Sequence, residues 1–461
     1  MSTLSPGSPA SPGAPASPAR TTRVFYASTL YGAATLAAAL DAGLFPAVDR
    51  TVLVVSNNAG TPELTPAVHE MPGFTALRHR FDSVLSWNET IAPFHPGGWV
   101  PREDDLPIWE RHLRLAWGLG DDTVELVLES IQVSPALTLA EIFTAARIEV
   151  YADGLMSYGP TRNRLDLQVG ARIRRLLHLD LVPGLVPLLL TEFGVPSETV
   201  PTADFLRVLD QLEHTAREFE TPEVAPALLL GQYLSTLGLI TEREEEELHL
   251  RMVRGVVGLG HKNVVFKPHP TAPASWSRRL EEEASKLGAQ LTVLDSPVLA
   301  EVLYRRLKPA LVVGCFSTAL FTASAFFGIP VARTGTEMLL DRLSPYQNSN
   351  RVPVTLVNAL VPPLDDDGTF RTEAQPAELV AAVGFVMQPQ MHPGLRPAVE
   401  TFLAGRQDAH TLRYFKRRRL TTLGLPGAVG PQLVRIPQNA AAQRVVRRAR
   451  RLRRAVLRLR A

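Results

Sequence analysis

The sequence VVFKPHP at residues 264–270 decides how the rest of the chain is interpreted. Its apolar, β-branched beginning is typical of a buried strand, and the two prolines end that strand abruptly. Lys267 and His269 are therefore expected at the carboxyl end of a strand, where α/β sheets bind ligands. Pro270 fixes its own φ and disfavours helical angles at His269, so the imidazole is expected on a stiff corner from which it can protonate a leaving phosphate. The same heptapeptide also fits a plain strand that ends in a proline-rich turn.

The sequence around this strand alternates between strand and helix patterns. Apolar runs typical of strands lie at residues 226–230, 263–266, 290–294 and 309–314. Helical patterns lie between and after them, at residues 242–259, 275–287, 297–307 and 317–327. Such alternation predicts a parallel sheet covered by helices.

An earlier part of the chain shows the same alternation. Strands are expected at residues 22–28, 51–56, 123–131 and 147–151, and helices at residues 29–44 and 137–146, while residues 57–122 are less regular. A helical pattern over residues 202–220 can bridge the two parts. The chain is therefore expected to be α/β, with two Rossmann-like, doubly wound domains facing a cleft.

This interpretation divides the chain into five segments. A chain of 461 residues can bury two cores of ordinary size. The expected segments are a disordered Ser/Pro/Ala-rich stretch (1–21), an N-terminal α/β domain (22–205), a C-terminal α/β domain (222–395), a returning segment and linker (396–440) and a basic tail (441–461).

Composition excludes several classes of protein. With 45% hydrophobic and 20% charged residues the chain has a globular composition. Its one cysteine, Cys315, excludes a disulfide framework and a cysteine-based zinc site and suits a reducing cytosol. The eleven histidines show no metal-ligand spacing such as HExxH. The first twenty residues lack the apolar core of a secretory signal, and no apolar stretch is long enough to predict a membrane span.

Asp153 is the first candidate for chemistry. It follows the expected strand 147–151, and Gly154 after it allows a tight turn with little bulk around the carboxylate. A carboxylate in that position can act as a general base toward a hydroxyl, although Asp-Gly is also common in surface turns. Two similar patterns, Asp366-Asp367-Gly368 and His95-Pro96, follow no clear strand and are expected to be structural loops.

Ser317 and Thr318 are the second candidates. They follow the apolar strand 309–314 and open a helix, where Ser317 is a natural N-cap. A helix amino terminus with two hydroxyl groups can bind phosphate, and it can equally be a plain cap. Gly231 and Gln232 end the neighbouring strand 226–230.

The order Asp153-Gly154, His269-Pro270, Ser317-Thr318 over two α/β units resembles the bacterial sialyltransferases of the GT-B fold. The whole chain most resembles their polysialyltransferase group. Two further stretches of sequence support the resemblance, YADGLMSY at 151–158 and HLDLVPGL at 178–185. The likeness covers about residues 22–390 and rests on the order and spacing of the motifs.

The resemblance implies an inverting transfer of sialic acid from CMP-sialic acid to a glycan hydroxyl, without metal or cofactor, in making polysialic acid or a surface polysaccharide. It assigns Asp153 as the base and His269 as the group that protonates or hydrogen-bonds the departing CMP phosphate. The family usually has two acidic residues before the glycine, and here the first is Ala152. The resemblance also makes residues 22–205 the acceptor-side domain and residues 222–395 the nucleotide-sugar donor domain. The donor-binding residues that it implies are Ser317, Thr318, Lys267, Pro270, Gly231 and Gln232.

Two alternatives stay open. CDP-glycerol phosphotransferases of teichoic acid synthesis also use a Lys-Pro-His-Pro-like segment and a later serine pair on a similar fold. They usually have an aspartate just before that pair, whereas this chain has Gly314-Cys315-Phe316. The other alternative is a catalytically inactive α/β protein that associates with membranes through its tail.

The basic tail suggests a partner. Residues 411–461 hold fifteen Lys and Arg and no acidic residue, which leaves residues 1–410 with a net charge of −13. In Arg444–Arg460, apolar residues recur at helical spacing among arginines, a pattern that favours an anionic membrane surface over nucleic acid or a merely solvated tail. The protein is therefore expected in the cytoplasm, peripheral on the inner face of the plasma membrane.

Overall fold

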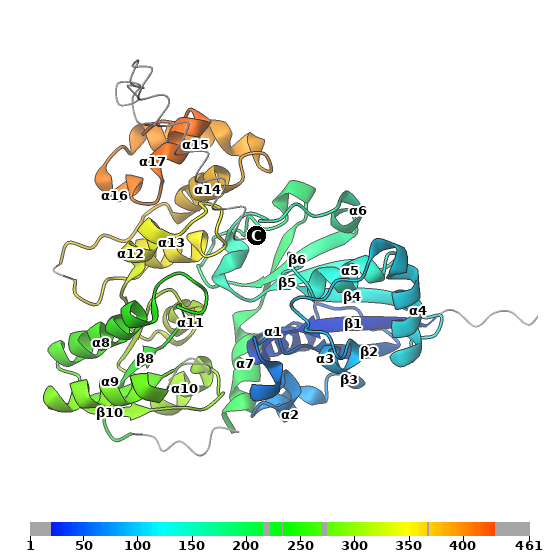
Figure 1. Ribbon diagram of the computed structural model, residues 1–461, viewed down its shortest axis with the longest axis horizontal. Helices are drawn as coiled ribbons and strands as arrows, with labels where there is room; N and C mark the ends of the chain where they lie inside the picture. Colours follow the sequence, from blue (N-terminus) through cyan, green and yellow to red (C-terminus); the bar gives the residue numbers. More distant parts are fainter. Residues whose placement is uncertain (1–19, 215–221, 233, 269–273, 367, 429–461) are drawn as a thin grey trace, which may run out of the picture.

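The computed structural model describes residues 20–214, 222–232, 234–268, 274–366 and 368–428 (Figure 1). Expectations for residues 1–19, for His269 and Pro270, and for the tail Arg444–Arg460 lie outside this part of the chain. Within it, two parallel sheets confirm the expected α/β class and its two doubly wound units.

The first sheet has seven strands in the order β3-β2-β1-β4-β5-β6-β7. Along β1, Phe25 and Ala27 are buried in one apolar cluster, while Val24 and Tyr26 are buried in another. Because successive side chains point to opposite faces, both faces of this sheet are covered, as parallel sheets require. The strands are β1 (Thr21–Ala27), β2 (Arg50–Val55), β3 (Ser83–Ser86), β4 (Thr123–Glu129), β5 (Arg147–Ala152), β6 (Ile173–Leu179) and β7 (Ser197–Val200).

The second sheet has five strands in the order β10-β9-β8-β11-β12. The heptapeptide that opened the sequence analysis supplies β9, which pairs with β8 and β10 in parallel. The strands are β8 (Ala227–Leu230), β9 (Asn263–Lys267), β10 (Gln290–Val293), β11 (Leu311–Gly314) and β12 (Val331–Arg333).

Helices pack around both sheets. Those of the first part are α1 (Leu30–Asp41), α2 (Phe74–Arg78), α3 (Trp87–Thr90), α4 (Leu106–Ala116), α5 (Ala136–Ile142), α6 (Leu167–Gly170) and α7 (Thr202–Glu213). Those of the second are α8 (Glu242–Gly258), α9 (Ala274–Lys286), α10 (Ala300–Leu307), α11 (Thr318–Phe327), α12 (Thr336–Arg342), α13 (Arg351–Leu360), α14 (Pro376–Met387), α15 (Arg396–Gly405), α16 (Ala409–Leu412) and α17 (Arg417–Leu423).

Helix α7 joins the two parts. It packs against α1 of the first part and α10 of the second. Its Phe205 makes edge contacts with Tyr31, at 5.4 Å between ring centroids, and with Phe326, at 6.0 Å. Arg305 donates to the Leu206 carbonyl at 3.3 Å. The expected bridging helix is therefore present over Thr202–Glu213.

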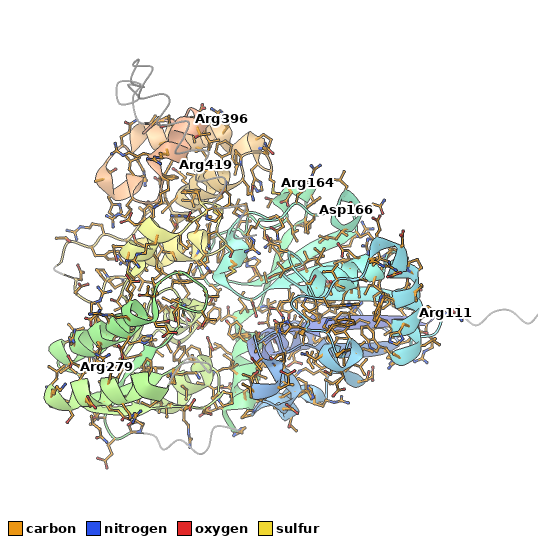
Figure 2. The ribbon with its side chains drawn as sticks, in the orientation of Figure 1. Arg111, Arg164, Asp166, Arg279, Arg396 and Arg419 are labelled. Carbon is orange, nitrogen blue, oxygen red and sulfur yellow. The ribbon has the colours of Figure 1, made fainter. Side chains whose placement is uncertain are left out.

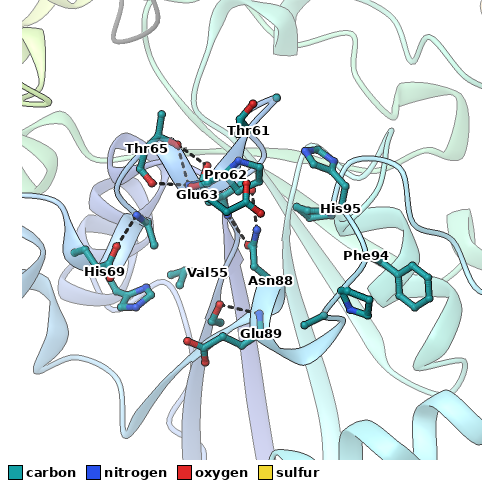
Figure 3. Close-up of a pocket in the computed structure, with 18 residues that line it drawn as sticks. Val55, Thr61, Pro62, Glu63, Thr65, His69, Asn88, Glu89, Phe94 and His95 are labelled. Carbon is teal, nitrogen blue, oxygen red and sulfur yellow. Dashed lines mark hydrogen bonds between the residues drawn. The ribbon is translucent and has the colours of Figure 1, made fainter.

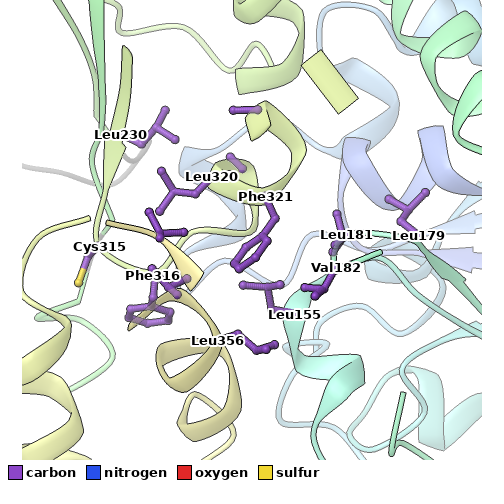
Figure 4. Packing of buried hydrophobic residues seen from close by; sticks show 14 of the residues in the cluster. Leu155, Leu179, Leu181, Val182, Leu230, Cys315, Phe316, Leu320, Phe321 and Leu356 are labelled. Carbon is purple, nitrogen blue, oxygen red and sulfur yellow. The ribbon is translucent and has the colours of Figure 1, made fainter. Parts of the chain in front are cut away.

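A single apolar cluster runs through both parts. Figure 4 shows Leu155 and Val182 of the first part close to Phe321 and Leu356 of the second. A methyl group added at Gly384 would lie 2.6 Å from the Leu188 side chain. The absence of a side chain at this position therefore lets α14 pack tightly on the first part as well. The two sheets are thus held at a fixed interface beside the site described below.

Three of the strands were not predicted from the sequence patterns, namely β3, β6 and β7. Residues 57–122 contain β3, whose sequence is SVLS, because a short and partly polar edge strand gives no apolar run. Strands β6 and β7 were not predicted either, since Ile173–Leu179 carries Arg174, Arg175 and His178. In the described part of the segment expected at 396–440, α15 and α17 pack on α14. Just after α14, Gln388 donates to the Arg162 carbonyl of the first part at 2.6 Å.

Candidate functional site

Asp153-Gly154 and Ser317-Thr318 meet across the boundary between the two parts. Asp153 follows β5, and Thr318 begins α11, directly after the β11 turn. The Leu155 amide lies 3.4 Å from the Thr318 hydroxyl, and a methyl group on Gly154 would lie 3.2 Å from the same oxygen. The absence of a side chain at position 154 thus lets the amino terminus of α11 approach the Asp153 turn.

The Asp153 carboxyl group has a strongly perturbed pKa. Burial, together with the nearby carboxyl groups of Glu129 and Glu301, raises this pKa to about 7. Helix α1 contributes to the crowding, because a methyl group on Gly32 would lie 3.3 Å from Asp153 Oδ2 and 2.9 Å from the Tyr151 hydroxyl. A carboxyl group with a pKa near neutrality is suited to exchange a proton with a substrate hydroxyl.

Glu129 is a site residue that the sequence analysis missed. It ends β4 opposite Tyr151 of β5, one strand away from Asp153. Its Oε2 accepts hydrogen bonds from the Ser28 amide and the Ser28 hydroxyl, both at 2.8 Å, and burial raises its pKa. A glutamate at the end of the apolar strand TVELVLE was the available signal, since carboxyl ends of neighbouring parallel strands meet at one edge.

The amino terminus of α11 is capped as expected. The Ser317 hydroxyl accepts a hydrogen bond from the Ala319 amide at 3.2 Å. The Gln232 side chain accepts from the Phe316 amide at 2.7 Å and so fixes the turn that leads into the helix. Since the first amides of a helix and its dipole attract anions, this end can hold a phosphate group.

Gly231 and Lys267 lie at the adjacent strand ends. A methyl group on Gly231 would lie 3.0 Å from the Phe266 ring and 3.2 Å from Pro268 Cα, so this glycine lets the Lys267-Pro268 corner pack against β8. The Lys267 ammonium group donates to the Ser296 carbonyl at 3.0 Å. Burial lowers the Lys267 pKa, while the carboxyl groups of Glu301 and Asp295 oppose this change. The lysine is therefore held at the site rather than extended into solvent.

A buried polar group lies behind these strand ends. Glu301 on α10 is 4% exposed, accepts a hydrogen bond from the Thr322 hydroxyl at 2.8 Å, and has a pKa raised by burial. The Tyr31 hydroxyl of α1 is buried, and burial together with the charges of Glu301 and Asp153 raises its pKa. Acidic groups from both parts thus surround the Asp153 side of the site.

A pocket of about 550 Å³ opens at the ends of β2 and β3 (Figure 3). His95 lines it, with Nε2 2.8 Å from the Ala59 carbonyl, and Glu63, Glu70 and Glu89 make its lining acidic. The sequence around Asp366 and Gly368, which was also expected to be a structural loop, lies in an exposed turn. There Asp366 accepts hydrogen bonds from the amides of Gly368 and Phe370.

A second pocket, of about 210 Å³, is lined by Met156 and Gly159 of the segment that follows the Asp153 turn, although Asp153 itself is not part of the lining. Tyr26, Ser28 and Glu129 line it at the carboxyl ends of β1 and β4, and Arg162 lines it from the segment after β5. Ser349 and Met387 of the second part complete the wall. Both halves of the protein therefore contribute to this pocket.

No helix in the described part of the chain combines the length and the apolar character needed to cross a membrane.

Comparison with known proteins identifies a family. A family model described as Alpha-2,8-polysialyltransferase (POLYST) matches residues 23–336. No curated protein sequence matches the chain.

Solved structures resemble the chain at low identity. UGT2 of Phytolacca americana, complexed with UDP-2fluoro-glucose and pterostilbene, is 13% identical with a TM-score of 0.40, over 88% of this chain and 99% of that chain. The GT-B domain of a sialyltransferase from Photobacterium damselae is 10% identical with a TM-score of 0.39, over 73% of this chain and 96% of that chain. MurG from Acinetobacter baumannii is 10% identical with a TM-score of 0.38, over 83% and 95% of the two chains.

Proposed function

The chain belongs to the alpha-2,8-polysialyltransferase family, and from that membership we propose that it transfers sialic acid from CMP-sialic acid to a glycan hydroxyl, with inversion and without a metal ion. The observation that carries the proposal is the meeting of a carboxyl group of pKa about 7 with a capped helix amino terminus across the boundary of the two domains. One side can accept a proton and the other can hold a departing phosphate.

Asp153 is the proposed general base. The acceptor hydroxyl oxygen forms a bond to the anomeric carbon of the sialyl group while its proton passes to Asp153. The bond from that carbon to the phosphate oxygen breaks, and CMP leaves with the bonding electron pair. Proton transfer to a positioned carboxylate accounts for roughly 100- to 10,000-fold in rate, which fits a loose transition state that needs little covalent assistance.

The amino terminus of α11 is the proposed phosphate site. Thr318 and the helix amides would stabilise the charge that develops on the departing CMP, and Ser317 keeps the first turn in place through its hydrogen bond to Ala319. Gly231 and Gln232 would support that turn, as their contacts with β9 and Phe316 indicate. Lys267 would add positive charge beside it.

His269 and Pro270 belong to the proposal through the family motif alone, because they lie outside the described residues. They follow Lys267-Pro268, whose backbone packs on Gly231. In the proposed mechanism His269 protonates or hydrogen-bonds the departing phosphate, so the base and the acid act from opposite domains.

The proposed reaction is tested by CMP release from CMP-sialic acid, with and without an oligosialic acid acceptor and with and without EDTA. The wild type should release more CMP with acceptor, EDTA should have no effect, and Asp153→Asn and His269→Ala should each lose most of the rate. Asp121→Asn, which changes an exposed carboxylate, is the matched control. Turnover of CDP-glycerol in place of CMP-sialic acid would overturn the sialyl assignment.

The product and the location belong to the same proposal. The acceptor would be a growing polysialic acid or another surface polysaccharide, and the basic segment Arg444–Arg460 would bring the enzyme to the anionic inner face of the plasma membrane. Binding to vesicles that contain anionic lipid, compared between the full chain and a chain ending at residue 440, tests this part. Equal binding by both chains would show that the segment Arg444–Arg460 has no role in binding to the membrane.

A further inference from the structure

We propose that Arg162 is the residue that recognises the acceptor, because it binds the carboxylate of the acceptor sugar in the 210 Å³ pocket that Glu129 also lines. The inference rests on the proposed function, because it assigns the residue that recognises the acceptor of that reaction. It arises from an arginine that lines the pocket and whose hydrogen bonds to the described residues come from its backbone, so its guanidinium group has no hydrogen-bond or ion-pair partner among them.

The backbone of Arg162 is fixed from both domains. Its amide donates to Gln132 Oε1 at 2.6 Å, and its carbonyl accepts from Gln388 Nε2 at 2.6 Å. The residue before it, Thr161, is fully buried and its hydroxyl accepts from the Leu190 amide at 3.0 Å. Position 162 is therefore held in place while its charged group stays unpaired among the described residues, which is the preorganised state that a binding group needs.

The charges of the pocket suit an acidic sugar. Among the described residues that line it, Arg162 carries the one basic side chain and Glu129 the one acidic side chain. A guanidinium group matches the two oxygens of a carboxylate and binds them with two parallel hydrogen bonds. A sialic acid offers its carboxylate and its reactive side-chain hydroxyl on opposite sides of the ring oxygen, so the carboxylate can meet Arg162 while the hydroxyl meets the acidic side of the site.

The backbone beneath the pocket is strained. Ser130 and Ile131 have φ values of 52° and 50°, which L residues and above all β-branched ones rarely adopt. Such strained residues are found mainly where a binding or catalytic site depends on them. Here the turn carries Gln132, which holds Arg162, and follows Glu129 directly, so both charged groups of the pocket depend on it.

The position of the pocket assigns the carboxylate to the acceptor rather than the donor. Its described lining comes from the first domain apart from Ser349 and Met387. The proposed phosphate-side residues that the structure describes are absent from that lining; they are Gly231, Gln232, Lys267, Ser317 and Thr318. Asp153 is not part of the lining either, but Glu129, whose charge raises the Asp153 pKa, is, so a carboxylate bound there lies on the first-domain side of the site.

The test compares Arg162→Gln and Arg162→Lys with the wild type on oligosialic acid and on oligosialic acid whose carboxyl groups have been reduced to alcohols. Arg164→Gln is the matched control, since Arg164 lies two residues away and is exposed on the outside of the first domain (Figure 2). In the wild type, kcat/KM should be at least about tenfold higher for the acidic acceptor, as expected for a charge-assisted pair. Arg162→Gln should abolish that preference, Arg162→Lys should restore part of it, and the KM for CMP-sialic acid should not change.

Three results would overturn the proposal. The first is an Arg162→Gln variant that keeps the wild-type preference for the acidic acceptor over the reduced one. The second is an Arg162→Gln variant whose lower activity comes from a higher KM for CMP-sialic acid. The third is an Arg164→Gln variant that loses the preference for the acidic acceptor to the same extent. Titration of acidic and reduced oligosialic acid into the proteins without donor separates this inference from the proposed reaction. If the wild type releases no CMP yet binds the acidic acceptor through Arg162, the reaction is wrong and the carboxylate subsite stands.

Discussion

Replacing Asp153 by asparagine should abolish transfer and, at pH 8, make the protein more stable. In the folded protein the carboxyl group has a pKa of about 7, while in the unfolded chain it returns to its ordinary value near 3.8. Between these values the folded state holds a proton that the unfolded state has lost. The stability that Asp153 contributes is therefore complete below pH 3.8 and is lost as the pH rises through 7.

The difference between the two pKa values sets the magnitude. At about 1.36 kcal/mol per pKa unit it corresponds to at most about 4 kcal/mol of stability lost at pH 8, and an asparagine side chain at this position has no charge to bury. The same pKa governs catalysis, because only the carboxylate can accept a proton. Its ionised fraction falls from about 0.9 at pH 8 to about 0.1 at pH 6, so wild-type kcat/KM should fall nearly tenfold over that interval.

The assay is denaturant unfolding of the wild type, Asp153→Asn and the control Asp121→Asn at pH 5 and pH 8, beside CMP release over the same range. Asp153→Asn should gain more stability over the wild type at pH 8 than at pH 5, and its CMP release should be low throughout. If Asp153→Asn is no more stable than the wild type at pH 8, or if wild-type kcat/KM does not change between pH 6 and pH 8, the carboxyl group is not buried as described and the argument for it as the base fails.

Further predictions concern the surroundings of this carboxyl group. Glu129→Gln removes a charge that raises the Asp153 pKa, so the acidic limb of the kcat/KM profile should move to lower pH; a limb that stays in place would show that the two groups do not interact. Gly32→Ala places a methyl group 2.9 Å from the Tyr151 hydroxyl and should cost about 1–3 kcal/mol by denaturant unfolding, whereas Gly60→Ala, with open space around it, should cost far less; equal losses would contradict the packing. Thr318→Val removes the hydroxyl at the domain boundary and should raise the KM for CMP-sialic acid several-fold with little change in the KM for acceptor, and the reverse pattern would place Thr318 on the acceptor side.

The sequence patterns predicted the elements whose conformation depends on a few neighbouring residues, such as β9 and the start of α11. The heptapeptide at 264–270 gave β9 because apolar, β-branched residues followed by proline leave few other conformations. Ser317 gave the start of α11 because its hydroxyl satisfies an amide of the first turn. The polar edge strand β3 and the arginine-containing β6 had no such signal, since their pairing with neighbours determines them.

The amino-acid sequence by itself determined the α/β class, the bridging helix α7 and the strand ends that carry Asp153 and Ser317, because each depends on residues that are close together in the chain. Only the tertiary structure decided which of these ends meet. Glu129, Gly32 and Arg162 gain their importance from contacts with residues far away in the sequence, such as Ser28 with Glu129 and Gln388 with Arg162. The pKa of Asp153 has the same origin, because burial by α1 and the charges of Glu129 and Glu301 exist only once both domains are folded and packed together.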